Sequence, residues 1–176
     1  MKMVKKMKIR INDLRCINQD INLDKYIEFR TLVKKSMPFP EWLGDFSKEE
    51  LNDNIINNDG KIWVYYDDEI PVCSMMLIPS TEKSIKKFEL SLDFKDVIDY
   101  GPMFVNPEYV GNGLQYQMLT EIDNYARTLG YKYAVGTIHP DNIYSINNLL
   151  KDNFELHGTK VFNRGLRNIY IKDLRG

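Results

Sequence analysis

One segment near the middle of the chain constrains the fold more than any other. It reads Val105-Asn106-Pro107-Glu108-Tyr109-Val110-Gly111-Asn112-Gly113-Leu114-Gln115. A β-rich run ends here, a proline turns the chain, two glycines let the backbone come close to another group, and a helical pattern begins. The first N–H groups of a helix have no partner inside it, and together with the helix dipole they favour an anion, most naturally a phosphate. We therefore expect a strand, an anion-binding loop and a long helix to follow one another.

Two common phosphate-binding motifs do not match this segment. A dinucleotide-binding loop needs a third glycine where this chain has Tyr116, and no Gly-Lys-Ser/Thr follows for a Walker A loop. Two glycines with one residue between them are a weak signal on their own. The alternative that Gly111 and Gly113 only form a tight turn therefore stays open.

The rest of the chain alternates between strand and helix patterns. Strands are predicted over residues 9–17, 61–66, 70–78, 97–105, 131–138, 154–162 and 166–171. Helices are predicted from residue 22 to the Pro38 region, from the Ser47/Glu50 capping box to about residue 56, from Leu114 to Gly130, and from Asn142 to about residue 150. Residues 79–96 give no clear pattern. The order β-α-α-β-β-β-α-β-α-β-β predicts one mixed α/β domain over residues 1–176, with a largely antiparallel sheet.

Composition excludes several classes of protein. The chain has 176 residues, and its 24 Lys and Arg nearly balance its 25 Asp and Glu. The apolar fraction of 43% and the charged fraction of 28% exclude a disordered or fibrous chain, and the balanced charge does not suggest a nucleic-acid binder. Two cysteines and two histidines indicate neither a disulfide framework nor a metal site. The basic first ten residues are followed by no apolar signal segment, and no apolar run is long enough for a membrane span, so we expect a cytoplasmic protein.

The central segment resembles the GNAT superfamily of acyl-CoA N-acyltransferases. In that family an apolar strand and x-Pro-x-Tyr precede Arg/Gln-x-x-Gly-x-Gly/Ala and a long helix, as in Met103 to Gln115 here. A second family motif, an Asn that opens the helix after the next strand, is similar to His139-Pro140-Asp141-Asn142. The element order matches over nearly the whole chain. The resemblance implies a twisted, mostly antiparallel sheet of about six to seven strands, flanked by helices, with splayed central strands.

The resemblance also implies a function and a set of binding residues. The chain would transfer an acetyl group from acetyl-CoA to a primary amine of a small molecule or peptide, by direct transfer in a ternary complex and without a metal. The backbone of Val110, Gly111, Asn112, Gly113, Leu114 and Gln115 would hold the coenzyme A pyrophosphate. The strand edge of Met103, Phe104 and Val105 would pair with the pantetheine arm and polarise the thioester carbonyl, and Asn142 and Ser145 would contact that arm from the other side.

Three positions depart from the family pattern. Val110 stands where the family usually has Arg or Gln, and Gln115 stands where it has Gly or Ala. Gln115 would either crowd the pyrophosphate or hydrogen-bond to it. Leu149 occupies the position of a tyrosine that many relatives use as a general acid, and it suits the apolar face of its helix. These departures leave open the alternative of a catalytically degenerate acyl-CoA-binding sensor or interaction domain.

Catalysis of acyl transfer to an amine needs a base if the amine arrives protonated. Asp99 lies six residues before Val105, which would put it on the same strand face as Met103 and Val105, and we expect it to be that base. The alternative is a carboxylate at a strand end in solvent. Tyr144, one turn into its helix, would protonate the departing thiolate unless it is a surface residue. Tyr100 and His139 are further candidates.

One charge pattern in the sequence bears on the chemistry of the acceptor amine. Residues 41–69 contain nine acidic residues and only two lysines. In relatives this region helps to wall the acceptor pocket, which leads to the hypothesis of a cationic acceptor. The alternative is a solvated acidic helix face and a hairpin turn. An exposed edge strand could also pair two copies into a homodimer.

Overall fold

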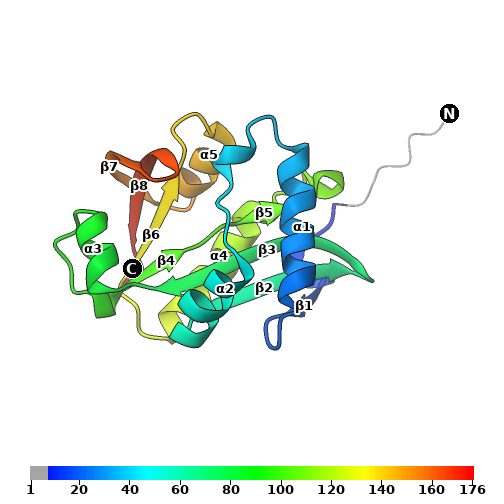
Figure 1. Cartoon of the computed structure of the whole chain (residues 1–176), viewed down its shortest axis with the longest axis horizontal. Coiled ribbons are helices and arrows are strands. Elements are labelled where there is room, and N and C mark those ends of the chain that lie inside the picture. Colours follow the sequence, from blue (N-terminus) through cyan, green and yellow to red (C-terminus); the bar gives the residue numbers. More distant parts are fainter. Residues whose placement is uncertain (1–7) are drawn as a thin grey trace.

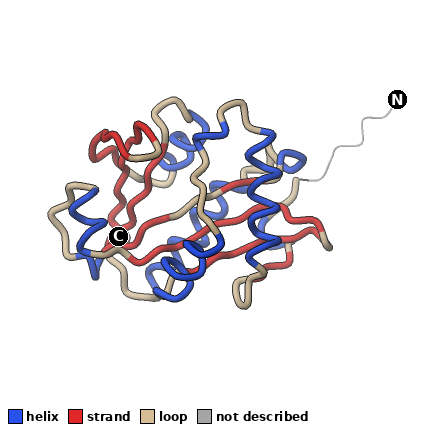
Figure 2. Tube along the Cα trace, viewed as in Figure 1, coloured by secondary structure: helices blue, strands red, loops and turns tan. Residues whose placement is uncertain are grey.

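The computed structural model describes residues 8–176, which form a twisted sheet between two layers of helices (Figures 1 and 2). The strands run in the order β1-β2-β3-β4-β6-β8-β7, and β5 pairs with β3 off this path. All neighbours are antiparallel except β4 and β6. The predicted mixed α/β fold with a mostly antiparallel sheet is confirmed. The strands are β1 (Arg15–Ile17), β2 (Lys61–Asp67), β3 (Ile70–Pro79), β4 (Val97–Tyr100), β5 (Phe104–Val105), β6 (Tyr133–Ile138), β7 (Glu155–Phe162) and β8 (Gly165–Asp173).

The helices lie where apolar periodicity and capping residues indicated, with one addition. They are α1 (Leu23–Ser36), α2 (Lys48–Glu50), α3 (Glu82–Lys87), α4 (Leu114–Thr128) and α5 (Ile143–Lys151). The Ser47/Glu50 capping box forms, but after α2 the chain continues as a wider turn over Leu51–Ile55. Helix α3 lies in the segment 79–96 that gave no clear pattern. Gly130 ends α4 with a φ of 84°, as predicted.

Two apolar clusters hold α1, α4 and α5 against the sheet, and a third holds α3. Tyr26, Phe29 and Val33 of α1 pack with Met76 and Phe104 on one face. On the other face the apolar side of α4 packs with β3 side chains such as Cys73, Met75 and Leu77, and α5 adds Ile146 and Leu149. Figure 1 shows α1 in front of the sheet and α4 behind it. Because β3 is covered on both sides, its residues are almost continuously buried.

The predicted strand over residues 97–105 is two strands. Tyr100 lies opposite Leu77, but Phe104 lies opposite Ser74, so three residues of this strand face two of β3. Gly101 sits at this bulge, where a Cβ would meet Met76 at 2.9 Å. One extra residue inverts the alternation of side chains beyond it. The sheet therefore has eight strands rather than six or seven.

The central strands separate after a short parallel ladder. β4 pairs with β6 only from Val97 to Asp99, and beyond this point β5 stays on β3 whereas β6 stays on β8. Figure 1 shows β6 diverging from the line of β4 and β5. This confirms the predicted splay. No helix among residues 8–176 is long and apolar enough to cross a bilayer. Most of the basic first ten residues lie outside the described part of the chain.

Candidate active site

A cleft of about 1030 Å³ opens where β5 and β6 separate. It continues past the glycine loop and the start of α5 at one end. At the other end it reaches the turn between β7 and β8 and the segment that follows α1. Nearly all of the predicted site residues line it, namely Asp99, Met103, Phe104, Val105, Val110, Gly111, Gly113, Leu114, Gln115, Asn142, Tyr144 and Ser145. The cleft therefore joins residues from both predicted motifs.

The glycine loop is held in place by polar contacts at its base. The Asn106 side chain donates to the Pro71 carbonyl (2.9 Å) and accepts from the Glu108 amide (3.1 Å), and this caps the short turn Pro107–Tyr109. The Tyr109 hydroxyl donates to Asp67 at the tip of the β2–β3 hairpin (3.0 Å). These contacts fix the entry of the loop against the hairpin. Asn106 was missed at the sequence level, although Asn before Pro is a known turn signal.

The loop presents a run of free amide donors. Gly111 and Gly113 have φ angles of 94° and 68°, which explains the need for glycine, and a Cβ at Gly111 would meet nothing within 4 Å. Gly113 is the N-cap of α4, and the first helical bond runs from the Gln117 amide to the Gly113 carbonyl (3.1 Å). Within the described residues, the amides of 111–116 donate to no other protein group. Open space, free donors and a helix N-terminus together suit a pyrophosphate.

The Asn112 side chain faces the protein and not the cleft. Its amide donates to the Tyr109 carbonyl (2.8 Å), and its oxygen accepts from the Ile9 amide (3.0 Å). Gln117 makes a parallel contact, because its side chain bonds both the Asn112 carbonyl (3.0 Å) and the Ile11 amide (2.8 Å). The segment before β1 thus braces the loop from behind. Asn112 can serve the site through its backbone alone.

The edge of β5 faces the cleft. The Asn106 amide donates to the Val72 carbonyl of β3 (2.7 Å). Because successive residues of a strand point their backbone groups to opposite sides, the amide of Val105 is directed away from β3 and into the gap between the strands. Phe104 packs on Phe29 with ring centroids 5.1 Å apart, so the edge is backed by the core. An extended ligand could add to this edge as a further strand.

Gln115 ties the two helices that flank the cleft. Its side-chain amide donates to the Ser145 hydroxyl (3.0 Å), and its oxygen accepts from the Asn148 side chain (3.0 Å). Asn142 caps α5 by accepting from the Ser145 amide (3.3 Å). The larger side chain at position 115 therefore turns toward α5 rather than over the glycine loop. Leu149 is buried in the core, as its helical position predicted.

Asp99 faces the cleft from β4, but on a different face of the sheet from the one expected. Its partner in β3 is Ile78, whereas that of Val105 is Cys73, and these two positions of one strand point to opposite sides. The prediction that Asp99 shares a face with Val105 is wrong because of the bulge at Gly101. Asp99 shares the face of Phe104, toward α1. Burial raises the pKa of Asp99 to about 7, although Arg164 and Lys87 act in the opposite direction.

The other candidate side chains occupy three different surroundings. Tyr144 is 84% exposed at the cleft mouth. Tyr100 donates its hydroxyl to Asp123 (2.5 Å) on the α4 side, where burial and this carboxylate raise its pKa. The ring of His139 stacks on Trp42 with centroids 5.7 Å apart. Tyr100 is therefore engaged in the core and is a poor candidate for proton transfer in the cleft.

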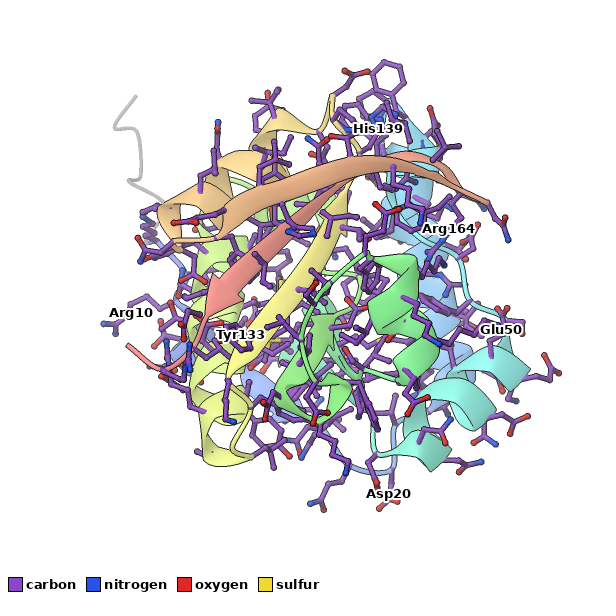
Figure 3. The ribbon with its side chains drawn as sticks, turned by 90° about the vertical axis from the view of Figure 1, so that its left-hand side faces the viewer. Arg10, Asp20, Glu50, Tyr133, His139 and Arg164 are labelled. Atoms are coloured by element: carbon purple, nitrogen blue, oxygen red, sulfur yellow. The ribbon has the colours of Figure 1, made fainter. Side chains whose placement is uncertain are left out.

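Three cations at one end of the cleft were missed at the sequence level. They are Lys87, Arg164 and Arg167, and we refer to them as the cationic cluster. The sequence marked Arg164 only as part of a turn. Figure 3 places Arg164 and His139 toward the same side of the molecule, and both contact the segment after α1, through Phe46 and Trp42 respectively.

The acidic residues of 41–69 lie elsewhere. None of them lines the cleft, whereas Trp42, Leu43, Gly44 and Phe46 from this segment do. Asp45 pairs with Lys34 (2.7 Å) and Glu50 accepts from the Ser47 amide (2.7 Å). The segment lines this end of the cleft through its apolar residues and Gly44, and of its acidic residues Glu41 is near enough to raise the pKa of Arg167. The residues that line the cleft therefore give no support to the cationic-acceptor hypothesis, which stays a prediction.

Several solved structures with the same fold are described as acetyltransferases. An N-acetyltransferase from Staphylococcus aureus Mu50 matches with a TM-score of 0.67 at 16% identity, over 92% of this chain and 99% of that one. The protein yncA from Salmonella typhimurium, solved with acetyl-CoA, matches with 0.63 at 14% identity, over 90% and 94%. An aminoglycoside N(6')acetyltransferase from Legionella pneumophila matches with 0.63 at 18% identity, over 91% and 92%.

Sequence comparison identifies the family. None of the curated protein sequences matches the chain. The family described as acetyltransferase (GNAT) family matches residues 27–153. This range runs from α1 to the end of α5 and includes the bulge, the splayed strands and the glycine loop. The chain belongs to the GNAT family of acetyltransferases.

Proposed function

We propose that this protein transfers an acetyl group from acetyl-CoA to a primary amine, directly and within a ternary complex. The observation that carries the proposal is the row of free amides at residues 111–116, which lies beside a gap between strands that leads to Asp99. Two of its structural relatives support acetyl-CoA as the donor: yncA was solved with it, and the Bacillus subtilis acetyltransferase was solved with CoA.

Each end of the cleft would have its own task. The amides of the glycine loop would bind the pyrophosphate oxygens, and the edge of β5 would bind the extended pantetheine arm. The Val105 amide, directed into the gap, would stabilise the oxyanion that forms on the thioester carbonyl. When bound, acetyl-CoA supplies an activated acyl group whose thiol is the leaving group.

Asp99 would take the proton of the attacking amine. Its pKa of about 7 is suited to this task near neutral pH, because a base is most effective when its pKa is close to the working pH. Tyr144 at the cleft mouth would return a proton to the departing thiolate, since Leu149 has no hydroxyl to offer.

The two cysteines support direct transfer over a covalent intermediate. Burial raises the pKa of Cys73 to about 12, and it also raises the pKa of Cys16. A thiol acts as a nucleophile in its ionised form. Neither residue lines the cleft. Acyl transfer through a cysteine is therefore disfavoured.

The proposal is tested by binding and turnover measured together. CoA should raise the melting temperature, because a ligand that binds the folded state stabilises it. Acetyl-CoA and a panel of primary amines should then release free thiol, which a chromogenic disulfide detects. Binding without turnover on a broad panel would instead point to the acyl-CoA sensor. The absence of any shift with CoA would contradict both functions.

A further inference from the structure

The acceptor end of the cleft has an unusual charge balance. The cationic cluster contributes three positive side chains, and Asp99 is the sole acidic residue among those that line the cleft within residues 8–176. Asp99 itself tends toward its neutral form, because burial raises its pKa. This end of the cleft therefore carries a net positive charge, which favours an anionic ligand.

Arg167 is a buried cation that has no carboxylate within ion-pair distance among residues 8–176. Its side chain is 7% exposed, and it donates to the backbone carbonyls of Leu166 and Glu41, both at 2.8 Å. Burial and the neighbouring Arg164 lower its pKa, whereas the Glu41 carboxylate acts in the opposite direction. A buried charge is normally paired, so an anion bound in the cleft would stabilise this guanidinium.

Arg164 is held in place by Phe46 and Gly44, and among residues 8–176 it likewise has no carboxylate within ion-pair distance. Its guanidinium carbon lies over the Phe46 ring, 5.3 Å from the centroid, and it packs against Gly44, where any Cβ would collide with it. The absence of a side chain at position 44 thus makes room for a guanidinium next to the cleft. Arg164 and Asp99 both line the cleft, and Arg164 lowers the pKa of Asp99.

The cationic cluster is not at the pyrophosphate end of the cleft. Asp99 precedes Val105 by six residues, and the glycine loop begins only after that. The partners of Asp99 and Val105 on β3, Ile78 and Cys73, are five residues apart, so at ~3.3 Å per residue Asp99 lies roughly 17 Å from Val105. An anion held by Arg164 and Arg167 would therefore belong to the acceptor. Trp42, Phe46, Phe88 and Phe162 also line this end, so the body of the acceptor would be apolar.

We propose that the acceptor is an amine that also carries a carboxylate, as an amino acid with an apolar side chain does. Arg164 and Arg167 would bind the carboxylate, since a guanidinium can make two parallel hydrogen bonds to it. Asp99 would then face the amine. This inference rests on the proposed function for the amine, whereas the carboxylate follows from the cationic cluster.

The test uses acetylated products, so that binding does not depend on turnover. The protein is saturated with CoA and titrated in a calorimeter with N-acetyl-L-phenylalanine and with N-acetylphenethylamine, which differ by the carboxylate alone. N1-acetylspermidine represents the cationic alternative. The carboxylated product should bind at least about tenfold more tightly than the other two, as expected for a charge-assisted contact.

Two variants assign this preference to the cluster. Arg164 is exposed in a turn, so Arg164→Gln should fold normally and reduce the preference to about threefold or less. The matched control is Arg15→Gln on β1, at the opposite edge of the sheet, and it should keep the full preference. A preference that survives in Arg164→Gln would overturn the assignment.

Failure of the inference and failure of the proposed function can be distinguished. The proposal of a carboxylate on the acceptor would be overturned by equal affinity for the matched pair, including no measurable binding of either. Tightest binding of N1-acetylspermidine would overturn it as well. The proposed function fails separately if a titration of the protein with CoA, carried out before any product is added, gives no binding signal.

Discussion

The substitution Asp99→Asn removes the proposed proton acceptor and keeps the size of the side chain. With a pKa of about 7, roughly a tenth of the wild-type carboxyl groups are ionised at pH 6 and roughly nine tenths at pH 8. The kcat/KM of the wild type should therefore rise about tenfold between these values from Asp99 alone. In the variant this inflection should disappear, and kcat/KM at pH 8 should fall about 100-fold or more, the range of general-base catalysis.

Stability measurements separate this effect from misfolding. Because the pKa of Asp99 is higher in the folded than in the unfolded chain, the folded state binds the proton more tightly. The group therefore lowers the free energy of unfolding as the pH rises from about 4 to about 7. Asp99→Asn removes this penalty, so at pH 8 the variant should be at least as stable as the wild type in urea.

The assay is free-thiol release with acetyl-CoA and the best amine of the panel, from pH 5.5 to 9. The control is Asp93→Asn, an exposed carboxylate shortly before β4 that does not line the cleft. It should follow the wild-type profile. A variant at position 99 that keeps both the rate and the inflection near pH 7 would refute the role of Asp99.

Three further predictions concern the glycine loop, the proton donor to the CoA thiolate and a buried aspartate. Gly111→Val should weaken CoA binding about tenfold in calorimetry, because a β-branched residue at φ 94° distorts the loop, and unchanged affinity would argue against a backbone cradle. Tyr144→Phe should lower kcat about tenfold or more at a similar KM if its hydroxyl protonates the thiolate, whereas an unchanged kcat removes this role. Burial raises the pKa of Asp152 to about 6, so the wild type should lose stability between about pH 4 and 6. In urea unfolding, Asp152→Asn should lose less stability over this pH range than the wild type does. The same dependence of the unfolding free energy on pH in both proteins would contradict the inferred burial of this charge.

Local signals explain why much of the fold could be predicted from the sequence. The Ser47/Glu50 capping box, Gly130 at the end of α4 and Asn142 at the start of α5 are all set by neighbours within one helical turn. The glycine loop belongs to the same class, because its φ angles and its free amides follow from the local chain. For the same reason the segment 79–96 was hard to assign: α3 has only six residues and its apolar face is short.

The errors came from contacts between distant segments. The face of Asp99 depends on a bulge that is visible only in the register of β4 and β5 on β3. Arg164 follows Asn163 in a turn sequence, and nothing local indicates that the turn lies against Gly44 and Phe46. Nothing local in residues 41–69 indicated that their acidic side chains would not line the cleft.

Gln115 illustrates a third kind of difference. Its position in the family motif suggested a contact with, or interference at, the pyrophosphate. The structure instead gives its amide two partners on α5, Ser145 and Asn148. A side chain of this length reaches the neighbouring helix α5. A motif within one segment of the sequence holds no information about that helix. The departure from the family pattern therefore leaves the glycine loop open.

The central claim is direct acetyl transfer within this cleft, and one time course tests it most directly. Purified protein, acetyl-CoA and a primary amine are mixed, and free thiol and acetylated amine are followed together, the latter by mass spectrometry. Our account predicts equal amounts of both products at all times, and almost no thiol when the amine is left out. Thiol release that does not depend on the amine, or CoA binding with neither product formed, would contradict it.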